Sequence, residues 1–275
     1  MKQSKLPQQT RRHLQFLPLA FSLAAIFIAV YALTSRSANF NLGLKAAKYN
    51  PKINPEDFTT KITNKYMTLT PGKKMIYEGE TEDGLEKIVI QITDKTKKVM
   101  GVTTVVYWDR AYLDGELIED TRDYLAQDKK GNVWYFGESV DNYEDGELID
   151  HDGSWLAGKD GAKPGIWFED NPQVGDTYRQ EYYQGEAEDM AKVLSTNEKV
   201  ATPFGTFKNC VKTLDWTPLE PGLEEHKYYC PQVGAMVLEE NPETSEKLEL
   251  IDIKNAGKND NDDNDDDDND DDDED

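Results

Sequence analysis

The chain has 275 residues, with 31 Lys and Arg against 54 Asp and Glu, and its formal net charge is -23. This length allows one large β domain or two small domains, and a hydrophobic fraction of 37% is too low for a polytopic membrane protein. The acidic excess argues against nucleic acid as a partner, because phosphate backbones need clustered Lys and Arg.

The charge is unevenly distributed along the chain. Residues 1–38 carry five basic residues and no acidic ones, whereas residues 259–275 carry twelve Asp and one Glu and no basic residue. The body between them, residues 39–258, therefore has a net charge of -15. We expect three segments with different roles.

The amino-terminal segment sets the expected compartment. Residues 1–12 are basic, and residues 13–35 predict a transmembrane anchor or a signal peptide, since the apolar stretch 16–33 meets the minimum for one membrane crossing. Four basic residues precede this stretch and one follows, so the amino end is expected in the cytoplasm. The rest of the chain would then be membrane-anchored outside the cytoplasm, or secreted or periplasmic if the signal is cleaved.

Residues 36–70 are predicted to be a connector. Asn50-Pro51 and Asn54-Pro55 break any long regular element, and a short helix is predicted from Pro55 to Asn64.

Residues 71–254 predict an antiparallel β domain. Apolar and polar residues alternate in short runs, as in the strand that places Ile88, Ile90 and Ile92 on one face. Further strands rich in β-branched and aromatic residues are expected at Val99–Trp108, Asn132–Phe136, Gly165–Phe168, Thr177–Tyr183 and Glu225–Tyr229. Tight turns are expected between the strands at Asp83-Gly84, Asp114-Gly115, Lys130-Gly131, Asp145-Gly146, Asp152-Gly153 and Asp160-Gly161.

The predicted fold class is therefore all-β. The strands would form an antiparallel meander that curls into an open or closed barrel or folds over as a sandwich. An amino-terminal helix would precede this domain, and residues 255–275, nearly all Asp and Asn, would follow it as a disordered acidic tail. Divalent cations are the expected partners of this tail, because oxygen ligands suit calcium; a purely solubilising tail is the alternative.

The two cysteines predict a disulfide. Cys210 and Cys230 are centred on residue 220, within the Pro- and Gly-rich loop 217–222. If the flanking runs pair as a hairpin about this loop, the two cysteines face each other across it. An exported chain meets an oxidising environment, and such a bridge would stabilise the fold by roughly 3 kcal/mol. A metal pair or a redox dithiol is the alternative.

Candidate ligand and metal residues come from two patterns. Trp108, Trp134, Trp167 and Tyr182 are candidates for an aromatic ligand face, although strand aromatics also supply core. The stretch from Asp141 to Asp152 imitates a calcium loop, with Asp141, Asp145 and Asp152 as candidate ligands. Tyr143 at its third position does not fit that loop, and Asp145-Gly146 also suits a plain hairpin turn.

No catalytic residue and no cofactor is predicted. His151 and His226 stand without a nucleophile, zinc or phosphate-loop motif, which favours surface or structural roles. A pair of carboxylates could hydrolyse glycosides, but the many Asp and Glu residues do not single out a pair.

One stretch carries a resemblance to a known type of protein. Pro203-Phe204-Gly205-Thr206-Phe207, followed by Tyr228-Tyr229-Cys230-Pro231-Gln232-Val233-Gly234, resembles the closing hairpins of uncharacterised bacterial exported β-rich proteins, over about residues 203–238. Some proteins of this type are open barrels akin to periplasmic lipoprotein carriers. The resemblance implies such a fold and assigns no catalytic residue.

The sequence leads to three hypotheses for the function. The first is a non-catalytic, envelope-exposed or secreted binding protein with an apolar or lipid-like ligand on an aromatic concave sheet face. The second is a calcium-handling acidic surface protein, and the third binds or hydrolyses carbohydrate. The sequence identifies no protein partner and no oligomeric state.

Overall fold

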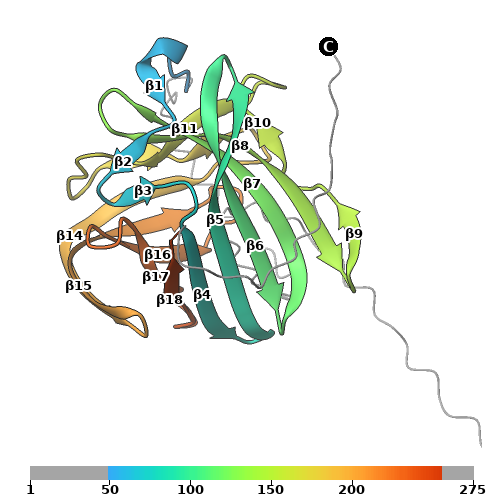
Figure 1. Ribbon diagram of the computed structural model, residues 1–275, viewed down its shortest axis with the longest axis vertical. Coiled ribbons are helices and arrows are strands. Elements are labelled where there is room, and N and C mark those ends of the chain that lie inside the picture. The colour runs from blue at the N-terminus through green and yellow to red at the C-terminus, as the bar shows by residue number, and fades with distance from the viewer. Residues whose placement is uncertain (1–48, 256–275) are drawn as a thin grey trace, which may run out of the picture.

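The computed structural model describes residues 49–255, and these residues form a strongly curled antiparallel sheet (Figure 1). The predicted amino-terminal helix and almost all of the predicted acidic tail lie outside the described residues. No helix among residues 49–255 is long and apolar enough to cross a membrane. The all-β, antiparallel prediction is confirmed, with the sheet in the form of a nearly closed barrel rather than a sandwich.

The elements follow one another with short connections, and the described residues hold a single 3-10 turn, η1 (Pro55–Asp57), besides the strands. The strands are β1 (Phe58–Thr59), β2 (Ile62–Asn64), β3 (Met67–Leu69), β4 (Lys74–Thr81), β5 (Gly84–Val99), β6 (Val102–Leu113), β7 (Glu116–Asp128), β8 (Val133–Glu144), β9 (Glu147–Asp150), β10 (Trp155–Leu156), β11 (Lys163–Phe168), β12 (Thr177–Arg179), β13 (Glu181–Tyr182), β14 (Met190–Thr202), β15 (Gly205–Trp216), β16 (Glu224–Cys230), β17 (Ala235–Glu240) and β18 (Lys247–Lys254).

The predicted turns connect neighbouring strands of the meander. Asp114 and Gly115 join β6 to β7 with φ of 50° and 90°, as a tight hairpin requires. One turn was missed, because Val99–Trp108 was expected to be a single strand. The chain instead reverses at Met100 and Gly101, with φ of 49° and 81°, and β5 pairs back onto β6.

The sheet closes through two different junctions. On one side, the last strand pairs with the first long strand, with Lys254 opposite Lys74. On the other side, one short segment bridges the gap: Thr177–Arg179 pair with β14, and Glu181–Tyr182 pair with β11. We call this bridging segment, residues 177–182, the seam. The seam pairs three residues with β14 and two with β11, so this junction depends on few backbone hydrogen bonds.

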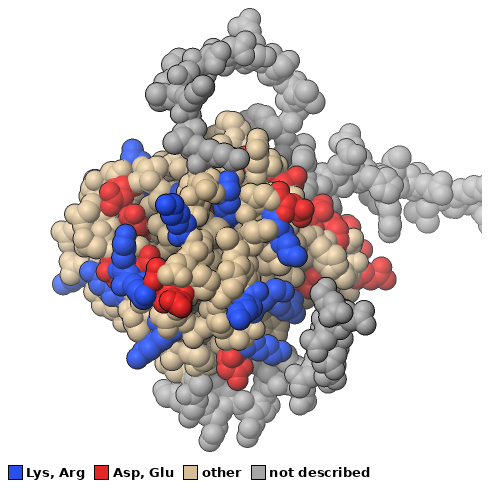
Figure 2. Space-filling view, turned by 90° about the horizontal axis from the view of Figure 1, so that it is seen from above, with Lys and Arg blue, Asp and Glu red and all other residues tan. Residues whose placement is uncertain are grey.

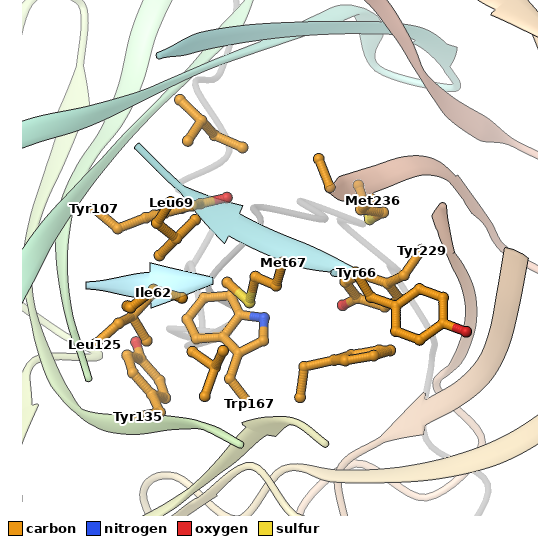
Figure 3. Close-up of a cluster of buried hydrophobic side chains, with 14 of the residues drawn as sticks. Ile62, Tyr66, Met67, Leu69, Tyr107, Leu125, Tyr135, Trp167, Tyr229 and Met236 are labelled. Carbon is orange, nitrogen blue, oxygen red and sulfur yellow. The ribbon is translucent and has the colours of Figure 1, made fainter. Parts of the chain in front are cut away.

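A hairpin from the predicted connector occupies the barrel interior. The helix expected at Pro55–Asn64 is wrong beyond the 3-10 turn η1, since β1 and β2 occupy most of that stretch. Figure 3 shows β2 and β3 surrounded by inward side chains of the barrel, with Ile62 and Met67 lying among Trp167, Tyr135 and Leu125. β2 and β3 pair with each other and form a sheet separate from the barrel. The burial of their apolar side chains stabilises the hairpin in the barrel interior.

Lys73 fastens the hairpin to the opposite wall. Its Nζ donates hydrogen bonds to the carbonyl oxygens of Val233, at 2.9 Å, and Gly234, at 3.3 Å. The Gly234 carbonyl also accepts the backbone N–H of Thr68 on β3. Burial lowers the pKa of Lys73 to about 8. The turn at residues 231–234 therefore serves as the anchor for β3.

The predicted disulfide is confirmed. Cys210 and Cys230 are joined, with their Cα atoms 4.3 Å apart, and both side chains are fully buried. The register of β15 against β16 pairs Val211 with Tyr229, which places the two cysteines opposite each other, as the hairpin about residue 220 requires. The Cys210–Cys230 disulfide fits an oxidising compartment.

Candidate functional site

A cleft of about 640 Å³ opens on the outer side of the barrel, beside the seam. We call it the tyrosine cleft. Its volume falls within the range of small-molecule sites. It is lined by Asn50, Asp160, Gly161, Lys163, Tyr182, Tyr183 and Gln184.

Two turns and one strand pair form the walls of the cleft. Asp160 and Gly161 form a tight turn between β10 and β11, with φ of 47° and 90°. Lys163, at the start of β11, is the register partner of Tyr182 on β13. After Tyr182 the chain turns sharply, since the N–H of Tyr183 donates to the carbonyl of Ala187 and the N–H of Ala187 donates back. This turn presents Tyr183 and Gln184 at the rim.

The Tyr182 ring is held from several directions. The Nζ of Lys163 and the guanidinium of Arg179 each lie 4.9 Å from its centroid, and the Tyr49 ring lies 5.6 Å away. Lys163 Nζ also donates a hydrogen bond of 2.7 Å to the carbonyl oxygen of Tyr49. Because Tyr49 is mostly buried, its pKa is raised to about 12. Tyr182 is therefore a positioned ring rather than a free one.

Tyr183 is the more available ring of the two. It packs against the apolar core and is half-buried, and it also lines the cleft. A ring supported from behind loses little conformational entropy when a ligand stacks on it. Asn50 and Gln184, both exposed, bring amide donors and acceptors to the same cleft.

A second, much smaller cavity lies inside the barrel wall at the same place. We call it the seam cavity; its volume is about 20 Å³. That volume holds about one water-sized ligand. It is lined by Tyr135, Trp167, Gln180, Glu181, Asp189, Lys227 and Tyr229.

The barrel interior around this cavity is rich in carboxylates. Nine acidic residues but only two lysines are buried among residues 49–255, and one of the nine, Asp120, lies on the outer face beside Trp108. Lys227 contacts three of these acids, with its Nζ 3.2 Å from Glu225, 3.4 Å from Glu239 and 3.9 Å from Asp215. By contrast, Figure 2 shows basic and acidic side chains interspersed over the outer face seen from above.

Burial controls the ionisation of these interior groups. It raises the pKa of Glu86 to about 8, with a further contribution from the charge of Glu225. Burial likewise raises the pKa of Asp123 to about 8, although the hydroxyl of Tyr135 donates to this carboxylate at 2.6 Å. The pKa of Glu119 rises to about 7 for the same reason. Glu86 and Asp123 therefore keep their protons near neutral pH, and Glu119 does so in part.

The four predicted ligand-face residues lie in separate places. Trp108 is on the outer face, where its Nε1 donates to Asp120 and the Arg110 guanidinium lies 4.0 Å from its centroid. Trp134 donates to Asp128 and contacts Phe58 edge-on. Trp167 is buried, with its ring centroid 4.7 Å from that of Tyr135. Only Tyr182 lines the tyrosine cleft.

The three predicted calcium ligands lie along the β8–β9 hairpin. Asp141 accepts from Arg122 at 3.2 Å and lies 2.7 Å from His151 Nδ1. Asp145 is in the turn with φ of 54°, and the N–H of Asp152 donates to Asp150. Within the described residues, no group of three or more His, Cys, Asp or Glu side chains is arranged to hold a metal ion.

Most of the cleft residues were not predicted. Asn50, Asp160 and Lys163 come from separate segments, and their meeting depends on the pairing of β11 with β13. The available sequence signals were the Tyr182-Tyr183 doublet at the end of a predicted strand and the Asp160-Gly161 turn.

The fold and the two cavities define the class of this protein as a nearly closed antiparallel barrel with a filled interior and an outer cleft beside its seam. No family model and no curated protein matches the chain. Among solved structures, it is similar to a "putative lipoprotein" from Parabacteroides distasonis at 14% identity and a TM-score of 0.38, covering 69% of this chain and 98% of that one.

Proposed function

We propose that this protein is a non-catalytic binding protein outside the cytoplasm that holds a neutral saccharide in the tyrosine cleft. The observation that carries the proposal is the lining of a ligand-sized cleft by adjacent Tyr182 and Tyr183 together with the amides of Asn50 and Gln184. Aromatic rings offer flat apolar faces to the C–H faces of a sugar, and amides pair with its hydroxyl groups.

The charge of the cleft fits a neutral ligand. Its lining contains one carboxylate, Asp160, and one ammonium group, Lys163, which balance each other. An anionic or cationic ligand would leave one of these charges without compensation. A neutral polyhydroxylated molecule uses both as hydrogen-bonding groups without disturbing the balance.

Binding is favoured over hydrolysis by the number of carboxylates. Glycoside hydrolysis uses two carboxyl groups that flank the scissile bond. Asp160 is the one acid among the residues lining the cleft, and Glu181 on the seam is only 3% exposed and lines the internal cavity instead.

An apolar or lipid-like ligand on the concave face requires more room than the interior offers. The seam cavity holds about 20 Å³, and the β2–β3 hairpin fills the space between the walls (Figure 3). Such a ligand would have to displace this hairpin. The predicted calcium-binding tail is a separate proposal, because it lies almost wholly outside the described residues.

The export of the protein is part of the proposal. The Cys210–Cys230 disulfide supports it, because disulfides persist in oxidising compartments. The amino-terminal apolar segment predicts the same compartment from sequence alone.

The test is binding of the purified full-length chain to an array of neutral glycans, followed by calorimetric titration of any glycan retained. Tyr183→Ala is expected to weaken binding by about tenfold or more, since loss of one stacking platform costs about 1–3 kcal/mol. Tyr112→Ala removes a half-buried tyrosine of β6 outside the cleft and should leave the affinity unchanged.

Two outcomes would contradict the proposal. One is an array with no glycan retained by the folded protein. The other is native mass spectrometry that shows a co-purifying lipid, with glycan affinity unaffected by Tyr183→Ala.

A further inference from the structure

The seam cavity contains buried oxygen atoms that lack partners. Glu181 Oε1 and Tyr229 Oη make no hydrogen bond, and their residues are only 3% and 2% exposed. Buried polar atoms are nearly always satisfied, because an unsatisfied one loses its interactions with water and gains nothing in return. Both residues line the same small cavity, so one occupant could satisfy both.

The charges around the cavity indicate which kind of occupant fits. Glu181 and Asp189 place two carboxyl groups on its wall. The ammonium group of Lys227 also lines the cavity, but it is already held by Glu225, Glu239 and Asp215. The charge of Lys227 also acts on Asp189, so this one ammonium group is shared among four acids.

A further oxygen donor is in place. The side-chain amide of Gln180 donates its N–H to Asp215 at 3.2 Å, so that the amide carbonyl is left as an acceptor at the cavity. Carboxylate, amide and phenol oxygens are the ligands that hard cations prefer.

From these contacts we propose that the seam cavity binds one monovalent cation of sodium size between the carboxyl groups of Glu181 and Asp189. The cavity volume of about 20 Å³ accommodates an ion smaller than water. When one of the two carboxyl groups keeps its proton, the pair carries a single negative charge, which one monovalent cation balances. The site is separate from the tyrosine cleft and does not depend on the saccharide proposal.

The ionisation of the two acids agrees with this arrangement. Burial raises the pKa of Asp189 to about 8, and it raises the pKa of Glu181 well above its ordinary value, with the charge of Asp189 adding to the effect. Without a cation, Asp189 keeps its proton near neutral pH. A bound cation replaces a proton, so its affinity should increase with pH.

The experiment measures the thermal unfolding midpoint of the full-length chain at pH 8 and constant ionic strength. Sodium chloride is compared with tetramethylammonium chloride, whose cation is too large for the cavity. We expect sodium to raise the midpoint by about 3 °C for each tenfold increase above its dissociation constant. The ²³Na resonance should broaden in the presence of the protein.

A matched pair of variants locates the site. Glu181→Gln keeps the side-chain shape and removes the charge, so it should abolish both sodium effects. Asp109→Asn is the control and should keep both sodium effects, because Asp109 is also buried but does not line the cavity, and the charges that act on it are those of Asp123, Glu119, Glu86 and Asp120.

Equal midpoints in sodium and tetramethylammonium, with no ²³Na broadening by the unmodified chain, would overturn the proposal and leave water as the occupant. Stabilisation by calcium alone, lost in Glu181→Gln, would overturn the monovalent assignment. If Glu181→Gln fails to fold, the unfolding midpoint of the unmodified chain decides the matter, because a cation bound to the folded barrel raises this midpoint in sodium relative to tetramethylammonium. Saccharide binding to the tyrosine cleft should be the same in every case.

Discussion

Lys227 is the residue on which the ionic balance of the barrel interior depends. It is 5% exposed, and its Nζ lies within 4 Å of Glu225, Glu239 and Asp215, so it is the one ammonium group among these acids. These neighbours raise its pKa well above the ordinary value, although burial alone would lower it. Its charge offsets part of their mutual repulsion.

Replacing Lys227 by Met should therefore destabilise the protein strongly. The loss is expected to be about 3–5 kcal/mol, because a buried ion pair that loses one partner leaves an uncompensated charge. Urea unfolding at pH 7 measures it. Lys212→Met, which removes a half-buried lysine of β15, is the control and should cost less than about 1 kcal/mol. An equal loss in both variants would show that the acids around Lys227 are already neutral.

The acidic side chains that point into the barrel were not predicted from the sequence. Polar residues alternate with apolar ones along the strands, and the usual interpretation places the polar set in water. Here Asp109 follows Tyr107 on the buried face of β6, and Glu225, Lys227 and Tyr229 share one face of β16. Alternation predicts which side chains share a face, but it does not predict which face is inside when both carry polar groups.

At the scale of elements, the hairpin turns and the register of the disulfide hairpin could be predicted, because both depend on residues that are close in sequence. Asp-Gly pairs marked the hairpin turns, and the loop centred on residue 220 set the register that joins Cys210 to Cys230. The turn at Met100 was missed because methionine carries no turn preference. A strand was predicted at Thr177–Tyr183, but its pairings with β14 and β11 were not, since they are long-range and only a few residues long.

The seam depends on close approach at one glycine. A Cβ added to Gly165 on β11 would collide with the backbone carbonyl of Gln180 and the N–H of Glu181. Only a residue without a side chain lets β11 and β13 come this close. The tyrosine cleft and the seam cavity both border this contact.

We expect Gly165→Ala to open the seam while leaving the rest of the barrel folded. Amide hydrogen exchange over residues 177–184 should accelerate by at least tenfold, and glycan affinity should fall with it. Gly205→Ala is the control, because a Cβ there meets only the flexible ring of Phe207 at 3.5 Å. If the rate of amide hydrogen exchange at the seam is unchanged in Gly165→Ala, the backbone accommodates the added Cβ and the pairing of the seam is not weakened.

At the scale of the whole molecule, the net charge of -15 in the body has a different meaning once the fold is known. Nine acids are buried among the described residues, and burial keeps several of them protonated at neutral pH. The folded body therefore carries less negative charge than its composition suggests. The acidic excess belongs partly to the interior rather than to a surface that attracts cationic partners.

This protonation makes stability depend on pH. Glu86 and Asp123 lose their protons near pH 4 in the unfolded chain, but near pH 8 in the folded one. Between these values the folded state binds more protons than the unfolded chain, so stability falls as pH rises from about 4 to about 8. Urea midpoints at pH 5, 6.5 and 8 should decrease in that order.

Variants separate this effect from general alkaline damage. Glu86→Gln and Asp123→Asn remove the titrating groups and should flatten the dependence of stability on pH. A dependence as steep in the double variant as in the unmodified chain would mean that other groups cause it.

The pairing of β18 with β4 has a consequence for how the chain reaches its fold. Lys254 lies opposite Lys74, so the edge of β4 finds its partner only after 180 further residues have been synthesised. Until then, a newly made chain presents an unpaired strand edge that can join a neighbouring chain instead. If the chain crosses a membrane in an unfolded state, strand pairing is delayed until the chain has crossed. We therefore expect the protein to require a chaperone that prevents association of unfolded chains before folding, more than after folding is complete.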